Sequence, residues 1–166
     1  RPYYITIKVD GSSGTFYVKD GKFGVCSRNL ELKDEEENGF WKISKKYDIE
    51  NKLKSYFINK NVAIQGEVYG PGIQGNLLGV GEISLAVFNL WDIDNKCYLS
   101  FDELKKFCKE CEIPMVDIII TTQNWAQFTE TWNFNDLNGN PNPPFITVVR
   151  QPEVKYGSNP ALMWNI

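Results

Sequence analysis

Four charged residues beside glycine-rich turns have the side chains that phosphate chemistry requires. Lys8 and Asp10 alternate onto one face of a predicted strand, directly before Gly11. Glu67 has the same position on another predicted strand, and Arg28 closes a predicted hairpin. A lysine, an arginine and two carboxylates placed in this way can hold a phosphate and a divalent cation. Surface salt bridges explain the same residues, so the residues alone leave both interpretations open.

Alternating apolar and polar residues predict the strands that position these side chains. Over residues 3–10 the apolar residues face one way, whereas Lys8 and Asp10 face the other. Over residues 62–69 the same alternation separates an apolar side from the side that carries Glu67. Each strand therefore has one face for a core and one face for chemistry.

The other predicted elements complete an α+β fold with antiparallel sheets and inserted helices. Ser100 and Glu103 form a capping box that opens a helix, and Asp48 is a candidate cap for an earlier helix. The remaining elements are a turn at 11–14, a hairpin of 15–19 and 22–28, an acidic loop or helix start at 34–37, helical stretches within 40–57, a glycine-rich turn at 70–76, strands at 83–91, 115–120 and 145–150, a short helix at 124–132 and a loop at 133–144.

Composition excludes several classes of protein. The chain has no histidine, which excludes Ser-His-Asp catalysis, Cys-His catalysis and histidine metal sites. The formal net charge of −3 argues against a wholly basic coat protein, but it permits a local basic groove. Cys108 and Cys111 have no second pair at zinc-site spacing, so we expect buried thiols in a reducing cell compartment. No apolar stretch approaches the ~20 residues that span a bilayer.

The charged residues belong to four motifs that occur in the order typical of one superfamily. Residues 7–11, Ile-Lys-Val-Asp-Gly, resemble the K-x-D-G nucleophile motif of covalent nucleotidyltransferases. Arg28 lies in a Ser-Arg pair about twenty residues later, where the superfamily has its S-R motif. Residues 66–74 resemble the G-E-x-Y-G-x-G-I-Q segment of RNA ligases, and residues 87–90 resemble the aromatic motif that follows it. The resemblance covers about residues 3–95 and is most specific around Glu67.

This resemblance implies a nucleotidyltransferase, ATP-grasp-like ligase fold and an ATP-dependent RNA ligase. Lys8 would attack the α-phosphate of ATP, carry AMP, and pass it to an RNA 5′-phosphate for joining. Mg²⁺ or Mn²⁺ would assist, and Glu67 would help to hold the metal. The residues that the resemblance implies for binding the nucleotide are Ile7, Asp10, Ser13, Arg28, Glu67 and Phe88.

Two later motifs of the superfamily are missing. Where an E-G-x-V segment is expected, the chain has Ile146 and Thr147, and Asn165 stands where a lysine is expected. We therefore expect residues 1–166 to form a single adenylation domain, incomplete at one or both ends. The alternative is an inactive or truncated relative that binds nucleotide or RNA without ligating. We expect a cytoplasmic monomer whose partners are ATP and broken RNA strands, with no membrane.

Two rival interpretations have weaker support. Residues 92–103 superficially resemble a calcium-binding EF-hand loop, but Cys97 stands where the sharp turn requires glycine and Lys96 stands at a ligand position. A hairpin fits this segment better. A DNA ligase or an mRNA capping enzyme shares the lysine motif, but the segment at residues 70–74 favours an RNA ligase.

Overall fold

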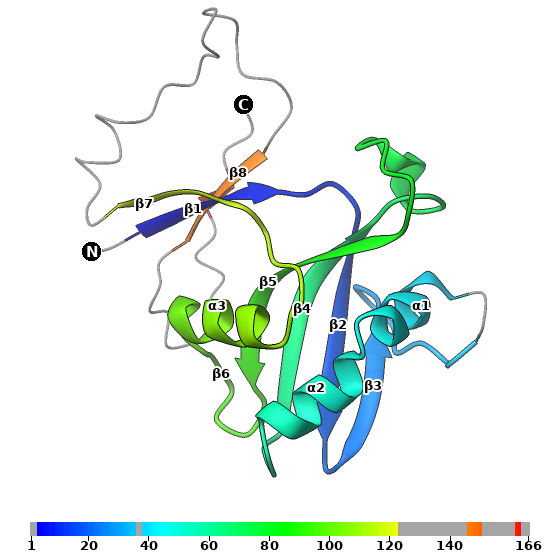
Figure 1. Ribbon diagram of the computed structural model, residues 1–166, viewed down its shortest axis with the longest axis vertical. Helices are drawn as coiled ribbons and strands as arrows, with labels where there is room; N and C mark the ends of the chain where they lie inside the picture. Colours follow the sequence, from blue (N-terminus) through cyan, green and yellow to red (C-terminus); the bar gives the residue numbers. More distant parts are fainter. Residues whose placement is uncertain (1–2, 36–37, 123–145, 151–161, 164–166) are drawn as a thin grey trace, which may run out of the picture. The chain divides into compact units, whose positions relative to one another are not determined.

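The computed structural model describes residues 3–35, 38–122, 146–150 and 162–163. Its residues cluster into two compact units, which we describe separately. Among the described residues, one unit contains residues 3–9, 116–122, 146–150 and 162–163, and the other contains residues 10–35 and 38–115 (Figure 1).

The first unit is built on a four-stranded sheet with the order β7-β1-β8-β9. Its N-terminal strand, β1 (Tyr3–Lys8), pairs antiparallel with both β7 (Ile118–Thr122) and β8 (Ile146–Arg150). The short strand β9 (Leu162–Met163) pairs with β8. The strand that carries Lys8 is therefore an inner strand, hydrogen-bonded on both sides.

The second unit contains a five-stranded antiparallel sheet with the order β3-β2-β4-β5-β6. Its three inner strands run side by side (Figure 1), and the hairpin of β2 and β3 turns at Asp20 and Gly21, as the sequence predicts. The strands are β2 (Ser12–Lys19), β3 (Lys22–Cys26), β4 (Val62–Tyr69), β5 (Ser84–Asp92) and β6 (Cys97–Tyr98).

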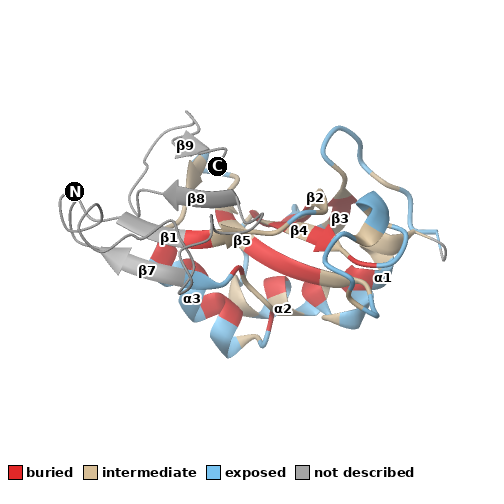
Figure 2. Ribbon diagram, turned by 90° about the horizontal axis from the view of Figure 1, so that it is seen from above, coloured by how far each residue is buried: buried red, intermediate tan, exposed pale blue. Residues whose placement is uncertain are grey.

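Three helices pack against one face of this sheet: α1 (Gly39–Lys46), α2 (Ile49–Tyr56) and α3 (Phe101–Glu110). Most of the buried residues of this unit lie between the sheet and these helices (Figure 2). The sheet contributes the alternate residues that the sequence pattern assigns to the core. The largest fully buried side chains are Phe16, Phe107, Ile43, Ile49, Leu53, Ile64, Leu85 and Leu90.

Local side-chain contacts start two of these helices. The Asn38 side chain accepts hydrogen bonds from the first backbone amides of α1, and the predicted capping box of Ser100 and Glu103 is present at α3. Asp48 precedes α2 in a left-handed conformation and makes no hydrogen bond that caps that helix. Its carboxylate instead accepts from the side chain of Asn51, so the predicted cap is wrong in its chemistry.

Two other predictions also need correction. Residues 12–14 belong to β2 and form no turn, because Gly14 is a strand residue packed under Phe40. A Cβ there would lie 3.0 Å from Cδ1 of that ring, so the glycine serves packing. The strand predicted at 115–120 begins at Ile118, after an isolated bridge between Met115 and Val87.

The remaining predictions have mixed outcomes. Strand β5 and hairpin strand β6 occupy the segment that resembles a calcium loop, which confirms the hairpin. The predicted helix at 124–132, the loop at 133–144 and Asn165 lie outside the described residues. Within the described part of the chain, no helix is long and apolar enough to cross a membrane.

Candidate functional site

The second unit has a polar face on the side of the sheet opposite its helices, and its polar side chains include those of Ser13, Tyr17, Gln65, Glu67 and Asn89. Ser13 on β2 lies directly opposite Glu67 on β4, and Glu67 lies opposite Ala86 on β5. Residues that face each other across antiparallel strands project to the same side of a sheet. The neighbours of Glu67 along β4, Gly66 and Val68, are buried on the helical side. Ser13 and Glu67 therefore place a hydroxyl and a carboxylate side by side on the polar face.

Gly11 allows the chain to enter this region in close contact with β4. A Cβ at Gly11 would overlap the carbonyl oxygen of Val68 and lie 2.9 Å from Cβ of Tyr69. No side chain fits there without moving backbone. The glycine of the nucleophile motif thus serves close approach, and it places the exposed Asp10 beside the end of β4 that carries Glu67.

Arg28 lies at the same end of the sheet. Cys26, the last residue of β3, is opposite Thr15, so the chain beyond it continues toward the level of Ser13 and Glu67. A tight turn then reverses the chain: the Ser27 amide donates to the carbonyl oxygen of Leu30 at 2.8 Å. Arg28 is exposed within this turn. The structure thus gathers an arginine, a serine and a glutamate at one end of the sheet.

Phe88 occupies an irregular position in β5. Gln65 pairs with Asn89 and Gly66 pairs with Val87, so Phe88 is an extra residue in a β-bulge. Bulges beside active sites re-aim side chains, and Phe88 is only half-buried, unlike the fully buried Val87 before it. This exposure fits a ring that takes part in binding better than a ring that is wholly in the core.

Lys8 and Ile7 belong to the first unit. Lys8 is the half-buried last residue of β1, opposite Ile146, and the Ile7 amide donates to the carbonyl oxygen of Asp117 at 2.9 Å. Along the chain, Lys8 is separated from Asp10 by one residue. The combined action of Lys8 with the residues of the polar face stays a prediction.

The candidate metal site consists of oxygen donors. Within the described ranges, no group of three or more His, Cys, Asp or Glu side chains gathers as a metal site would. Mg²⁺ in nucleotide sites is commonly held by one or two carboxylates together with substrate phosphates. Glu67 with the neighbouring Ser13 hydroxyl fits that donor set, because hard divalent cations prefer oxygen ligands.

The cysteines are free thiols rather than a metal site. Cys108 is buried and Cys111 is partly exposed, so the predicted burial is confirmed fully for only the first. Burial raises the pKa of Cys108 to about 12, and the nearby Cys111 adds to the shift. Such a thiol is protonated at neutral pH, whereas metal binding requires the thiolate.

Sequence reasoning missed two side-chain pairs near this site. Asn89 donates to Gln65 at 3.0 Å on the polar face, and Tyr17 donates to Glu31 at 2.6 Å beside the turn that carries Arg28. The alternation of β2 and β4 places Tyr17 and Gln65 on the polar face, but no sequence signal indicates the partner of either one.

Comparisons with known proteins identify the family of the chain and solved structures with a similar fold. A sequence model of the RNA ligase family matches residues 1–149. The fold is similar to the Naegleria gruberi RNA ligase, with 29% sequence identity, in a lysine-to-alanine variant with ATP and Mn (TM-score 0.78) and in a lysine-to-methionine variant with AMP and Mn (TM-score 0.79). The same ligase with PPi also matches, at TM-score 0.78 and 29% identity.

These matches cover 98% of this chain but only 48 to 49% of the Naegleria gruberi chains. The chain therefore spans about half the length of the ligases that it matches. A search among curated proteins finds no match. The family match extends over most of the sequence and includes every residue of the polar face, and the chain belongs to the RNA ligase family.

Proposed function

We propose that this chain is the adenylating part of an ATP-dependent RNA ligase with Lys8 as its nucleophile. The Lys8 amine, after losing a proton, forms a bond to the α-phosphorus of ATP. The bond from that phosphorus to the bridging oxygen breaks, and pyrophosphate leaves. AMP is then transferred to an RNA 5′-phosphate, and attack by a 3′-hydroxyl joins the strands and releases AMP. We further propose that the protein repairs broken RNA as a cytoplasmic monomer.

Family membership is the main support for this proposal. The matching Naegleria gruberi ligase has structures with ATP and Mn, with AMP and Mn, and with PPi. ATP is the substrate of lysine adenylation, whereas pyrophosphate and the AMP group are what it produces. The proposal transfers this chemistry to Lys8, the lysine of the K-x-D-G motif in this chain.

The residues of the second unit have separate roles in the proposal. Arg28, whose planar guanidinium suits phosphate oxygens, binds the nucleotide phosphates or ribose. Phe88 stacks on the adenine ring from its bulge. Glu67 binds the ribose or a divalent metal, with Ser13 beside it as a further oxygen ligand or phosphate contact. Asp10 shapes the entry to Gly11.

Lys8 and Ile7 act from the first unit in this proposal. Ile7 contacts the nucleotide through its backbone next to the nucleophile. A lysine amine is protonated at neutral pH under ordinary conditions, so a nucleophilic lysine requires nearby positive charge. Mg²⁺ or Mn²⁺ supplies such charge and also neutralises the phosphates.

A nucleotide-binding relative that does not ligate is the second candidate. One observation favours it: strand β8 has Ile146 and Thr147 where the superfamily has Glu-Gly. A missing carboxylate there removes one metal ligand, which would impair adenylation more than nucleotide binding.

Covalent labelling tests the proposal directly. We expect the protein, incubated with α-³²P-labelled ATP and Mn²⁺, to retain label on a denaturing gel, and we expect Lys8→Ala to abolish the label. Lys19→Ala, a change at an exposed lysine at the end of β2, is the matched control and should label normally. Undiminished label in Lys8→Ala rejects the nucleophile. ATP binding without any label in the wild type favours the second candidate.

A further inference from the structure

The turn that carries Arg28 is held by side-chain contacts that the proposed chemistry does not use directly. We infer that Tyr17 is a positioning residue for Arg28, acting through its hydrogen bond to Glu31. The inference rests on the proposed function, since it assumes that Arg28 binds the nucleotide.

Tyr17 reaches across the edge strand of the sheet. It lies opposite Gly24 of β3 on the polar face, and a Cβ at Gly24 would overlap the tyrosine ring. The glycine therefore lets the ring lie flat across β3. Beyond that strand, the Tyr17 hydroxyl donates to the Oε1 atom of Glu31 at 2.6 Å. A short hydrogen bond to a carboxylate is among the stronger side-chain contacts.

Glu31 is the point at which the Arg28 turn rejoins the sheet. Its backbone forms an antiparallel bridge with Cys26, which is the last residue of β3. The Ser27 amide donates to Leu30 O at 2.8 Å, and the Leu32 amide donates to Val25 O at 2.8 Å. A contact that holds Glu31 therefore holds one end of a closed loop of four residues that contains Arg28.

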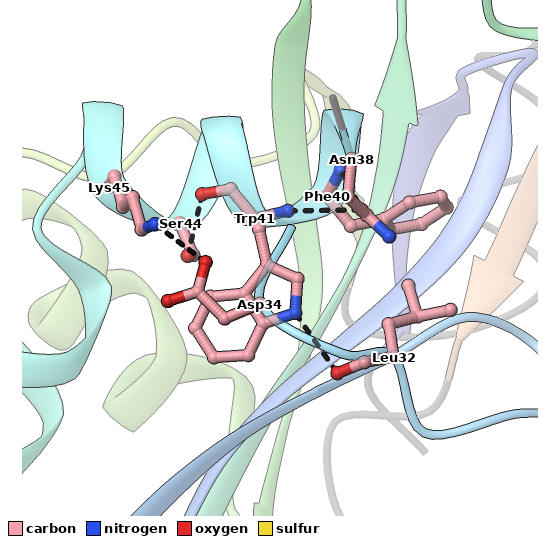
Figure 3. Close-up of polar contacts among 7 residues, drawn as sticks. All are labelled: Leu32, Asp34, Asn38, Phe40, Trp41, Ser44 and Lys45. Carbon is pink, nitrogen blue, oxygen red and sulfur yellow. Dashed lines mark hydrogen bonds and ion pairs between the residues drawn. The ribbon is translucent and has the colours of Figure 1, made fainter. Parts of the chain in front are cut away.

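A second set of contacts holds the same segment from α1. The indole Nε1 of Trp41 donates to the carbonyl oxygen of Leu32 at 3.0 Å, and Lys45 pairs with Asp34 at 2.6 Å (Figure 3). The ion pair is exposed and contributes little. The Trp41 bond restrains Leu32, just beyond Glu31. Tyr17 is thus the tether on the polar-face side, and Trp41 is the tether on the helix side.

The tethers have a consequence for nucleotide binding. Arg28 is exposed, and a long side chain on a loose turn must lose both backbone and side-chain freedom when it binds a phosphate. A turn that is already ordered lowers this cost before the ligand arrives. Removing the Tyr17 hydroxyl should therefore weaken ATP binding through Arg28, and this inference gives Tyr17 no direct contact with the nucleotide.

A double-mutant cycle tests this dependence. Dissociation constants for ATP with Mn²⁺ are measured by isothermal titration calorimetry for the wild type, Tyr17→Phe, Arg28→Ala and the double variant. We expect Tyr17→Phe to weaken binding about tenfold in the wild type, in line with the loss of one hydrogen bond to a charged group. We expect no further weakening in the Arg28→Ala background. Equal weakening in both backgrounds would overturn the inference.

Two controls separate positioning from a general loss of structure. Tyr98→Phe makes the same change on the same row of the sheet, because Tyr17, Ala63, Trp91 and Tyr98 lie opposite one another in turn. It should leave ATP affinity unchanged. Glu31→Gln keeps an acceptor oxygen and should stay within about threefold of the wild type, whereas Glu31→Ala should match Tyr17→Phe.

Hydrogen exchange tests the tether without any nucleotide. In the free protein, the amides of residues 27–31 should exchange faster in Tyr17→Phe than in the wild type, and amides of β4 should not change. Unchanged exchange at residues 27–31 would overturn the inference and leave the proposed function standing. If exchange at residues 27–31 is faster in Tyr17→Phe but the wild type binds no ATP, the proposed function is overturned, and with it the role given to Arg28.

Discussion

Replacing Gly11 by alanine probes how closely the motif glycine must approach β4. The added methyl group would overlap the carbonyl oxygen of Val68 and lie 2.9 Å from Cβ of Tyr69. Ordinary carbon–carbon contacts are about 3.5 to 4.0 Å, so the backbone at Gly11 must move away from β4 by on the order of 1 Å. Backbone and Cβ atoms cannot rotate away, so we expect the overpacking cost of about 1 to 3 kcal/mol in the free energy of unfolding.

The same shift should also reduce activity. Gly11 is three residues from Lys8 along the chain and is next to the strand that carries Glu67. Displacement of about 1 Å at a reacting group costs on the order of 10²-fold in rate. We therefore expect the rate of covalent AMP labelling at saturating ATP to fall by about that factor. The assay is a time course with labelled ATP, together with urea denaturation of the same preparation.

Gly81→Ala is the matched control for this prediction. A Cβ at Gly81 would meet no atom within 4 Å, and its φ angle lies outside the left-handed region, so the same substitution should change neither stability nor labelling. Near-normal labelling by Gly11→Ala would refute the reasoning, because it would mean that the backbone at Gly11 moves away from β4 without displacing the site. Equal losses in both variants would also refute it, because the steric contact would then be irrelevant.

Four further measurements test three side chains: Tyr17, Cys108 and Ser100. The hydrogen bond to Glu31, with burial, raises the pKa of Tyr17 to about 12, so a tyrosine absorbance step near pH 12 should disappear in Tyr17→Phe. Since that pKa exceeds the unfolded value of about 10, the contribution of Tyr17 to stability is complete below pH 10 and is lost as the pH rises to about 12. Urea unfolding measured at several pH values over this range should therefore show a smaller loss of stability in Tyr17→Phe than in the wild type. Burial raises the pKa of Cys108 to about 12, so iodoacetamide at pH 8 should alkylate Cys97 well before Cys108. The order of alkylation is measured by mass spectrometry, and labelling of Cys108 first would contradict its burial. Ser100→Ala removes the acceptor for the Glu103 amide at the start of α3 and should lower the free energy of unfolding by about 1 kcal/mol. An unchanged midpoint and slope in urea unfolding would show that the cap contributes nothing to stability.

Sequence patterns predicted the elements whose stability is local. The alternation over residues 62–69 gives the bounds and the two faces of β4 without error, because burial of one face imposes a period of two. The Ser100–Glu103 pair located the start of α3, because both hydrogen bonds of a capping box are made within four residues. The placement of Ser13 and Glu67 side by side follows from the same periodicity once β2 and β4 are paired.

Features that depend on distant contacts were not predictable. The sequence predicts a turn that includes Gly14, but this glycine is a strand residue that accommodates Phe40, which is far away in the sequence. Asp48 has the chemistry of a helix cap, yet its left-handed backbone turns the carboxylate toward Asn51. The hydrogen bond between Tyr17 and Glu31 joins strand β2 to a residue beyond β3, so it becomes evident only once β2 and β3 are paired.

The bulge in β5 makes Phe88 unnecessary to the sheet that contains it. Excising this residue would bring the pair of Val87 with Gly66 next to the pair of Asn89 with Gln65, and an uninterrupted ladder would result. Every other side chain of the strand would keep its present face, because the residues before and after the bulge are already paired in regular register with β4. A single-residue deletion at this position should therefore spare folding, and any loss of nucleotide affinity in the shortened protein would measure what the aromatic ring contributes beyond architecture.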